Sequence, residues 1–373
     1  MKVAIIGGKL QGIEAVYLAK DAGYESILID HNPKAPASGF CDRFVCGDII
    51  AREEAVISAL KEADFVLPAN ENEQVLQAIK EICEEEGLKL AFDFAAYDIS
   101  SSKRLSDQLF AEHGIPCPLH YPEGKAPYII KPSGESGSVG VTYAETEEAV
   151  EAFYLAHPDK ENWIVQEYLQ GDSYSIEVIG NQEAYRTYAI TQIHMDNKYD
   201  CCKVTSPCNI SSEQKEAFAE IGKKIASLIH LQGIMDVEVI DDDGQLKVLE
   251  IDARIPSQTP ITVLYSSGDN LLVQLAEITL FGKFLTKQQG KSQPTAYEHY
   301  RRFHGEIIQD GEHVMGEAKP LHLKQGWCGS DVVITDYVQD QDDFRGIFVN
   351  WADTEDALLT KREEVVRQLK LLP

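Results

Sequence analysis

The sequence predicts an α/β chain that begins with a doubly wound parallel sheet and continues as an α+β region with a small β-rich end. Three observations predict this. Short apolar runs alternate with helical stretches over residues 1–98. Longer helices and runs with period-two alternation then replace that pattern. Finally, 373 residues are too many for one ordinary hydrophobic core.

In the N-terminal part, the expected strands are apolar and end at turn residues. Gly7 and Gly8 follow the first strand, and Gly23 closes the first helix. Strands buried on both faces of a parallel sheet need such continuous apolar runs, so this part is Rossmann-like. The predicted strands are Lys2–Ile6, Ser26–Asp30, Ala63–Pro68 and Leu88–Asp93, and the predicted helices are Gly12–Ala22, Arg52–Glu62 and Glu73–Glu86.

From about Ser100 the spacing changes, and strands and helices no longer alternate regularly. The predicted helices there are Ser102–His113, Glu145–Ala156, Ser211–Leu231 and Asn270–Phe281. The predicted strands are Tyr128–Lys131, Trp163–Tyr168, Ser173–Ile179, Ile234–Ile240 and Gln245–Ile251. From about Gly290 we expect short strands and one terminal helix, Thr354–Leu371.

The charge balance excludes some partners. The chain has 34 Lys and Arg against 61 Asp and Glu, a net charge of −27. Nucleic-acid backbones and anionic membranes attract basic surfaces, so we expect neither as a partner. No run approaches the roughly 18 apolar residues of a membrane span, and no signal peptide is visible. The eight cysteines form no C-x-x-C pair, which favours reduced thiols and a cytoplasmic protein.

A first glycine cluster, Gly7–Gly12, lies between the first strand and first helix, and Asp30 ends the second strand. This arrangement resembles the dinucleotide fingerprint, in which an acid meets the ribose. However, Lys9 stands where the middle glycine would let the backbone approach a pyrophosphate. Three interpretations stay open: a nicotinamide site, a turn needed only for packing, and a site for a small ligand or a nucleotide edge.

A second glycine cluster, Lys131–Gly140, follows a predicted strand. Its amides and hydroxyls can surround phosphates, and Lys131 can neutralise one of them. The lysine precedes the glycines, so this is not the usual P-loop order. A flexible surface hairpin would explain the glycines alone.

An acidic hairpin follows. Asp236 and Glu238 share one strand face, as do Glu250, Asp252 and Arg254. If Asp242–Gly244 forms a three-residue loop, the acidic faces coincide, with Asp236 opposite Glu250 and Glu238 opposite Val248.

Such facing acids repel each other unless a cation lies between them. Oxygen ligands alone favour magnesium, and Arg254 on the same face suits a phosphoryl group. The alternative is a solvated sheet face.

The order of these motifs resembles the ATP-grasp ligases: strand, Lys131 and glycine loop, the hinge-type strand Ile164–Leu169, Glu177, and the acidic hairpin. The family pattern ends in Glu-x-Asn-x-Arg, and this chain has Asp252 instead of Asn. The resemblance implies a pre-grasp domain at 1–98, an ATP-grasp domain at 99–290 with a lid at about 120–180, and a C-terminal domain at 291–373.

Four segments are similar to the 3-methylornithine–L-lysine ligases of pyrrolysine biosynthesis: Gly7–Gly12, Pro68–Asn72, Gly233–Glu238 and Glu250–Pro260. That resemblance implies ATP and Mg²⁺ as cofactors, with methylornithine or ornithine and L-lysine as small-molecule substrates. The carboxylate would become an acyl phosphate, which the lysine side-chain amine then attacks. A homodimer is one open possibility for its assembly.

The site residues follow from the resemblance. Arg254 and Lys131 would be catalytic, with Arg254 at the carboxylate. Magnesium would be held by Glu238, Glu250 and Asp252. ATP would be bound by Lys9, Asp30, Asp48, Ile49, Lys103, Lys131, Ser138, Glu167, Tyr168 and Leu169. L-lysine would meet Leu10, Gln11 and Asn72, and the ornithine-type substrate would meet Glu177, Asp236, Ser257, Gln258 and Thr259.

Three alternatives remain at this point. The chain could be another ATP-grasp ligase or carboxylase with different substrates. It could be a nicotinamide-dependent oxidoreductase built on the first domain, against which Lys9 and the acidic hairpin argue. It could also be a catalytically inactive nucleotide sensor that keeps the loops.

Overall fold

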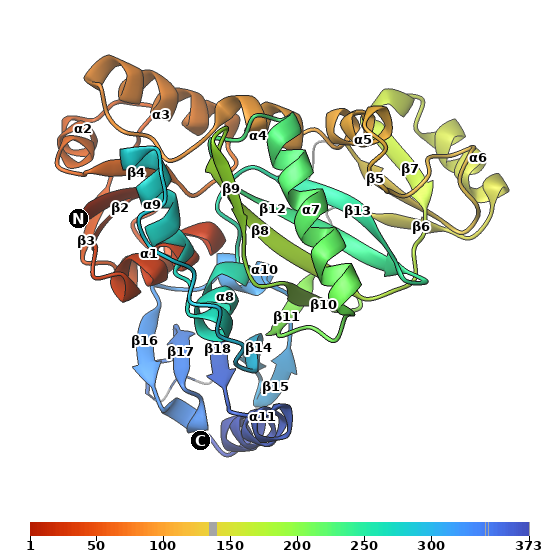
Figure 1. Cartoon of the computed structure of the whole chain (residues 1–373). Helices are drawn as coiled ribbons and strands as arrows, with labels where there is room; N and C mark the ends of the chain where they lie inside the picture. Colours follow the sequence, from red (N-terminus) through yellow and green to blue (C-terminus); the bar gives the residue numbers. More distant parts are fainter. Residues whose placement is uncertain (134–139, 340, 342, 373) are drawn as a thin grey trace.

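The structure is a computed structural model that describes residues 1–133, 140–339, 341 and 343–372. Its N-terminal sheet is parallel, with strand order β3-β2-β1-β4 (Figure 1). The strands are β1 (Lys2–Ile6), β2 (Glu25–Asp30), β3 (Arg43–Cys46) and β4 (Phe65–Pro68), and the helices are α1 (Leu10–Asp21), α2 (Glu54–Lys61) and α3 (Glu73–Glu86).

Helices cover both faces of this sheet. Alternate side chains of β1 point to opposite sides, and because those of residues 3–6 are all apolar, each side must be covered. Val3 and Ile5 belong to the hydrophobic cluster that contains α1. Ala4 and Ile6 belong to the cluster that contains residues of α2 and α3. The expected Rossmann-like arrangement is therefore confirmed.

The predicted strand at Leu88–Asp93 is wrong. Leu90 makes only an isolated bridge to Val66, and the chain then enters α4 (Phe94–Ser100). Asp93 starts that helix, because its Oδ1 accepts hydrogen bonds from the amides of Ala95 and Ala96, each at 3.1 Å. The sequence reading missed α4 and also β3, which is short and has no fully buried residue.

A small antiparallel sheet, β6-β5-β7, stands apart in the upper right of Figure 1 and has its own hydrophobic core. Its strands are β5 (Tyr128–Pro132), β6 (Thr142–Ala144) and β7 (Trp163–Glu167), and α6 (Glu147–Ala156) covers one face. The helix α5 (Lys103–Glu112) precedes it in the chain. The second glycine cluster, which falls within the predicted lid at about 120–180, lies largely outside the described residues, and so does Ser138.

The third sheet is large, and strands from both ends of the remaining chain share it. Its main order is β13-β12-β8-β10-β11-β14-β18-β17-β16, with β9 on β8 and β15 on β14. The six strands of this sheet that come first along the chain are β8 (Ser173–Asn181), β9 (Ala184–Thr187), β10 (Thr191–Met195), β11 (Cys201–Ser206), β12 (Gly233–Asp242) and β13 (Gln245–Asp252). The C-terminal strands are β14 (Thr295–Phe303), β15 (Glu306–Gln309), β16 (His322–Gln325), β17 (Val332–Thr335) and β18 (Phe344–Trp351).

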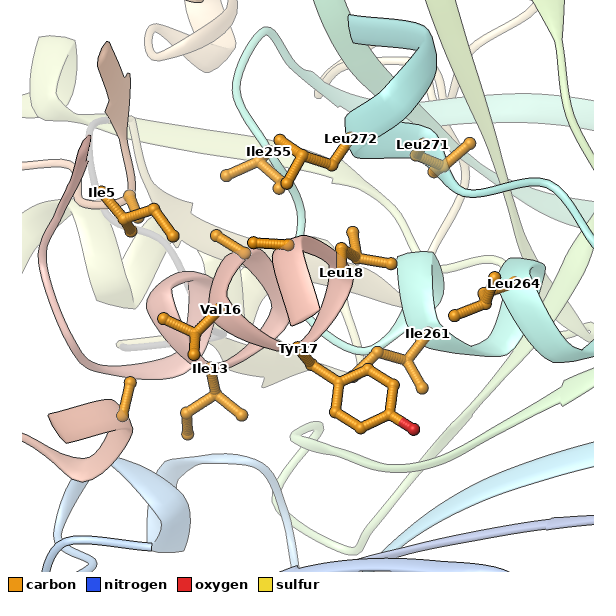
Figure 2. Packing of buried hydrophobic residues seen from close by; sticks show 14 of the residues in the cluster. Ile5, Ile13, Val16, Tyr17, Leu18, Ile255, Ile261, Leu264, Leu271 and Leu272 are labelled. Carbon is orange, nitrogen blue, oxygen red and sulfur yellow. The ribbon is translucent and has the colours of Figure 1, made fainter. Parts of the chain in front are cut away.

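Helices pack on this sheet and connect it to the N-terminal domain. They are α7 (Ser212–Leu228), α8 (Thr259–Ser267), α9 (Leu271–Phe281), α10 (His313–Gly316) and α11 (Glu355–Lys370), and short 3-10 turns lie at Pro36–Gly39, Lys160–Asn162 and Trp327–Gly329. Figure 2 shows α1 lying beside α8 and α9, with Val16 and Leu18 in one cluster with Ile261. Within the described residues, no helix combines the length and the apolar character needed to cross a membrane.

Candidate active site

The acidic hairpin forms, but its register differs from the predicted one. Asp242 pairs with Gln245, so the turn has two residues, Asp243 and Gly244, with φ values of 50° and 92°. Such a turn of two left-handed residues is typical of tight hairpins. The three-residue loop predicted for Asp242–Gly244 is therefore wrong.

A β-bulge places the acidic side chains of β12 and β13 on the same face of the hairpin. The register shifts between Glu238 and Val239, which pair with Glu250 and Val248, so that Leu249 is the extra residue. Without it, the two-residue turn would place the acids of β12 and β13 on opposite faces. The observed pairs are Glu238 opposite Glu250 and Asp236 opposite Asp252, and these replace the predicted pairs.

The pKa values of the facing acids are shifted in opposite directions. Burial, together with the neighbouring carboxylates, raises the pKa of Glu238 and of Asp252 well above the usual range. Burial also acts to raise the pKa of Glu250, but Lys103 and Lys131 outweigh it and hold that pKa below its usual range. Lys103 Nζ lies 3.0 Å from Glu250 Oε2.

These carboxylates are suitable magnesium ligands by chemistry, because all their donors are oxygen and their mutual repulsion would be relieved by a cation. In the described part of the chain, no three His, Cys, Asp or Glu side chains already stand in a metal-binding group. Glu250 instead contacts Lys103, and Asp252 Oδ2 accepts a hydrogen bond from Arg254 at 2.9 Å.

A cavity of about 190 Å³ lies between the small antiparallel sheet and the acidic hairpin. Lys103 and Lys131 line it together with Glu238 and Glu250. The hinge residues Glu167, Tyr168 and Leu169 also line it.

The Glu167 side chain is already engaged. Its Oε1 accepts hydrogen bonds from Lys247 Nζ at 2.9 Å and from the Leu119 amide at 3.1 Å. The backbone N–H of Glu167 also donates to the Leu119 carbonyl at 2.9 Å, so this hinge residue is tied to Leu119 through both its side chain and its backbone.

A second cavity, of about 100 Å³, adjoins the first and shares Met195, Tyr199, Glu238 and Glu250 with it. Its walls include the predicted residues Asp236, Asp252, Arg254, Ser257, Gln258 and Thr259. Residues that the sequence reading did not single out also line it, among them Asp200, Cys201 and Glu312. These come from other strands or from the C-terminal part, and no local motif marks them.

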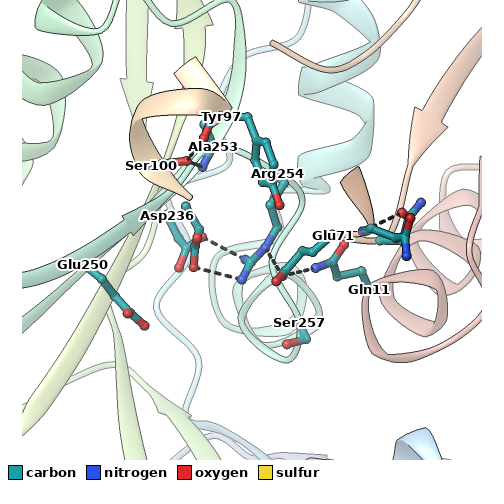
Figure 3. A network of polar contacts seen from close by, with 12 residues as sticks. Gln11, Glu71, Tyr97, Ser100, Asp236, Glu250, Ala253, Arg254 and Ser257 are labelled. Atoms are coloured by element: carbon teal, nitrogen blue, oxygen red, sulfur yellow. Dashed lines mark hydrogen bonds and ion pairs between the residues drawn. The ribbon is translucent and has the colours of Figure 1, made fainter. Parts of the chain in front are cut away.

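Arg254 lies between Glu71 and Asp236 and contacts both, as Figure 3 shows. Its Nε donates to Glu71 Oε1 at 2.9 Å, its Nη2 donates to Asp252 at 2.9 Å, and its Nη1 donates to Asp236 Oδ1 at 3.3 Å. Burial alone would lower its pKa, but Asp252, Glu71 and Asp236 raise that pKa well above the ordinary value. The guanidinium is thus permanently charged and fixed in direction.

A third cavity, of about 550 Å³, lies in the N-terminal domain at the end of its parallel sheet. The predicted residues Lys9, Leu10, Gln11, Asp30, Asp48, Ile49 and Asn72 all line it. Asp30 Oδ2 accepts a hydrogen bond from the Gly8 amide at 2.7 Å, so the acid holds the glycine turn in place.

Two neighbouring residues, Glu71 and Asn72, make different contacts that the sequence did not reveal. The Asn72 side chain caps α3 by accepting from the Val75 amide at 3.0 Å. Glu71 instead accepts from Gln11 Nε2 at 2.7 Å and from Arg254, and so links the N-terminal cavity to the second cavity. Glu71 was missed because only the tertiary structure brings Arg254 to it.

Glu177 is placed differently from the other predicted substrate residues. It is fully buried on β8, where it pairs with Asp236 of β12. It does not line any of the three cavities described above. Burial raises the pKa of Glu177 to about 7 and that of Asp236 to about 7, with Arg254 opposing the rise at Asp236. Glu177 therefore lies behind the cavity wall.

Comparisons with known proteins agree with this geometry. Residues 100–258 match the model of the ATP-grasp domain, and residues 3–91 match that of the PylC-like N-terminal domain. The chain is 39% identical to the 3-methyl-D-ornithine–L-lysine ligase of Methanosarcina acetivorans over 84% of this chain and 83% of that protein. It is 37% identical to the ligase of the same name from Methanosarcina mazei, over 84% and 81%.

Solved structures share the fold at lower identity. Biotin carboxylase from Campylobacter jejuni, in a β-γ-ATP complex, superposes with a TM-score of 0.73 at 17% identity, covering 98% of this chain and 91% of that one. N5-carboxyaminoimidazole synthetase from Staphylococcus aureus, with ADP, gives a TM-score of 0.70 at 17% identity over 99% and 96%. These likenesses show the fold.

Proposed function

Because the chain belongs to the ATP-grasp ligases, and among them to the family of the 3-methyl-D-ornithine–L-lysine ligases, we propose that it joins 3-methyl-D-ornithine to L-lysine. The bond formed would be an amide between the methylornithine carboxylate and the lysine side-chain amine, a step of pyrrolysine biosynthesis. ATP would supply the activating phosphoryl group and leave as ADP, and inorganic phosphate would leave when the amine attacks the acyl phosphate.

The observation that carries this proposal is the shared wall of the first two cavities. Glu238 and Glu250 line both, with Lys103 and Lys131 on one side and Arg254 on the other. A phosphoryl group of a nucleotide in the first cavity would therefore lie beside a carboxylate held by Arg254 in the second. Holding both reactants in one geometry removes much of the entropic part of the barrier.

Charge in this site is arranged before the reaction begins. Lys131 is partly buried, and this burial lowers its pKa although Glu250 opposes the shift. Lys103 and Lys131 would face the phosphate oxygens, whose charge spreads during phosphoryl transfer. Glu238, Glu250 and Asp252 would hold Mg²⁺, which when bound neutralises phosphate charge.

The amine substrate would reach the activated carboxylate from the N-terminal cavity. Leu10 and Gln11 line that cavity, and Glu71 stands where it meets Arg254. Glu71 is better placed than Asn72 to receive a lysine ammonium group, because Asn72 is committed to capping α3. Water would hydrolyse an acyl phosphate, so closure over the site favours the amide product.

The test is product analysis with the purified full chain. We expect ATP, Mg²⁺, L-lysine and 3-methyl-D-ornithine to yield one amide and one ADP per turnover, as measured by mass spectrometry and an ADP assay. Omitting either amino acid should stop both amide formation and ADP release. D-ornithine and L-ornithine in parallel assign the stereochemistry and the need for the methyl group.

Amide formation from other carboxylate–amine pairs, with none from ornithine isomers, would instead identify another ligase of the same fold. A homodimer and a cytoplasmic location also stay predictions. Gel filtration with light scattering checks the first.

A further inference from the structure

A fourth cavity, of about 290 Å³, lies outside the site described above and shares no wall residue with the other three cavities. Its floor includes Ile176 of β8, which is 1% exposed and belongs to the same hydrophobic cluster as Phe218 of α7. Ser173, also on β8, lines the first cavity instead. Side chains three positions apart on a strand point to opposite faces of a sheet. The fourth cavity therefore lies against the face of β8 that α7 covers, away from the catalytic cavities (Figure 1).

The floor of this cavity is apolar, and distant parts of the chain build it. Besides Ile176, it includes Ala219 of α7 and the residues Ile190 and Pro207, which lie at the neighbouring ends of β10 and β11. Small-molecule sites in proteins are mostly apolar and have volumes from roughly 300 Å³ upward. A cavity of this size and lining fits a small organic molecule.

The charge of this cavity is opposite to that of the whole chain. Its described walls carry two lysines, Lys215 of α7 and Lys291 of the segment before β14, and neither Asp nor Glu. Carboxylates line each of the other three cavities, and the chain has 61 acidic against 34 basic residues. Within the part of the chain that the structure describes, neither lysine side chain forms an ion pair or a hydrogen bond. Two such ammonium groups beside an apolar floor attract an organic anion.

Cys208 also lines the cavity, but its thiol is not poised to react. The residue is 7% exposed, and its Sγ donates a hydrogen bond to the Ile190 carbonyl at 3.1 Å. Burial raises the pKa of this thiol to about 12, although the charge of Lys215 opposes the rise. A thiol that keeps its proton is a poor nucleophile, so we expect reversible binding in this cavity.

We propose that the fourth cavity is a separate binding site for a small organic carboxylate with an apolar body. The carboxylate would lie between the ammonium groups of Lys215 and Lys291, and the apolar body would cover Ile176 and Ile190. The occupant would not be a reactant, because the sheet lies between this cavity and the phosphate-binding Lys131. The inference does not depend on the proposed function.

Ligand-observed NMR titrations of the full chain test this binding directly. The probe is 3-phenylpropionate, and 3-phenylpropionamide is a neutral molecule of nearly the same shape. The test variant combines Lys215→Met with Lys291→Met, which removes both charges and keeps unbranched side chains. The matched control combines Lys20→Met with Lys89→Met, two exposed lysines of the N-terminal domain.

We expect the unaltered chain and K20M/K89M to bind 3-phenylpropionate at least tenfold more tightly than 3-phenylpropionamide. Losing a charge-assisted hydrogen bond corresponds to roughly a 10- to 100-fold loss of affinity. K215M/K291M should therefore lose this preference, while its affinity for the amide stays within twofold. No preference in the unaltered chain, or a preference that K215M/K291M retains, would overturn the inference.

Two further comparisons locate the anion and define its chemistry. Lys131→Met alters the first cavity only, so it should leave the probe affinity within twofold of that of the unaltered chain. A loss in K131M as large as that in K215M/K291M would place the probe in the catalytic cavities instead. Inorganic phosphate should bind at least threefold more weakly than 3-phenylpropionate, because it covers no apolar surface. Phosphate binding as tight as that of the probe would contradict a site for an organic anion.

Discussion

The guanidinium of Arg254 and the carboxylate of Glu71 form an ion pair, with Nε and Oε1 2.9 Å apart, across 183 positions of the chain. The same Oε1 accepts a hydrogen bond from Gln11 Nε2 at 2.7 Å. One oxygen atom thus connects the N-terminal cavity to the arginine at the centre of the site. This contact joins the segment after β4 to the residue that follows the acidic hairpin.

Replacing Glu71 by Gln should weaken this connection without removing bulk. Hydrogen bonds to charged groups contribute about 1.5–3 kcal/mol, so we expect the KM for L-lysine to rise at least tenfold while the KM for ATP changes little. Steady-state ADP release at varied L-lysine measures this. Glu73→Gln, in the exposed first turn of α3, is the matched control, and equal effects of the two variants would contradict the role of Glu71.

Replacing Lys131 by Met should raise the KM for ATP at least tenfold. Methionine is also long and unbranched, so packing is largely retained while the partly buried charge near Glu250 is lost. Amino-acid affinity should change much less. The exposed Lys125→Met serves as control. Unchanged ATP dependence in K131M would argue against phosphate binding by this lysine.

Replacing Glu250 by Gln should abolish the ADP release that depends on both amino acids, with at least a hundredfold loss expected. Glu250 lines both cavities, holds Lys103, and is the acid whose charge the lysines maintain. Glu84→Gln, exposed on α3, controls for the substitution itself. Full activity in E250Q would refute its assignment as a metal ligand.

Replacing Gly311 by Ala should displace the segment that carries Glu312, because the added Cβ would meet Asp200. We expect a rise of roughly tenfold in the KM for the ornithine-type substrate, because Glu312 lines the second cavity and a small misplacement of a site residue can cost that much. Gly316→Ala is the control, since nothing lies within 4 Å of a Cβ placed there. Equal kinetics for both variants would show that the approach to Asp200 has no functional consequence.

The buried Glu14 should make the free energy of unfolding depend on pH. Its side chain is fully buried in α1, Oε2 accepts from the Ile261 amide at 3.0 Å, and burial raises its pKa from 4.5 to about 8. Between these pH values the unfolded chain has lost the proton that the folded chain keeps, so Glu14 makes the protein less stable as pH rises. Below pH 4.5 this effect disappears.

Glutamine at position 14 cannot ionise. Relative to the unaltered chain, Glu14→Gln should therefore gain stability on the order of 3 kcal/mol between pH 5.5 and pH 8. Chemical denaturation of both proteins across that range measures the difference, with the exposed Glu84→Gln as control. A difference between E14Q and the unaltered chain that does not vary with pH would contradict the raised pKa.

Local patterns in the sequence predicted many elements of the fold, but they missed β3, α4, β6, β9, β10, β11 and α8. Apolar runs and their bounding turns predicted β1 at Lys2–Ile6 and α3 at Glu73–Glu86 with the bounds that the structure has. The prediction failed where a segment's environment decides its state. Leu88–Asp93 reads as a strand, but only one bridge forms there, and the cap at Asp93 starts a helix instead.

The acidic hairpin separates the two kinds of information most clearly. The sequence by itself determined which residues carry charge, that Glu238 and Glu250 lie on strands, and that the family motif ends at Arg254, because residue type and period-two alternation are local properties. The tertiary structure alone decided that a bulge at Leu249 sets these acids face to face. It also brought Glu71 to Arg254, and Glu312 to the wall of the cavity that Arg254 lines, because contacts between distant segments depend on packing that no local pattern encodes.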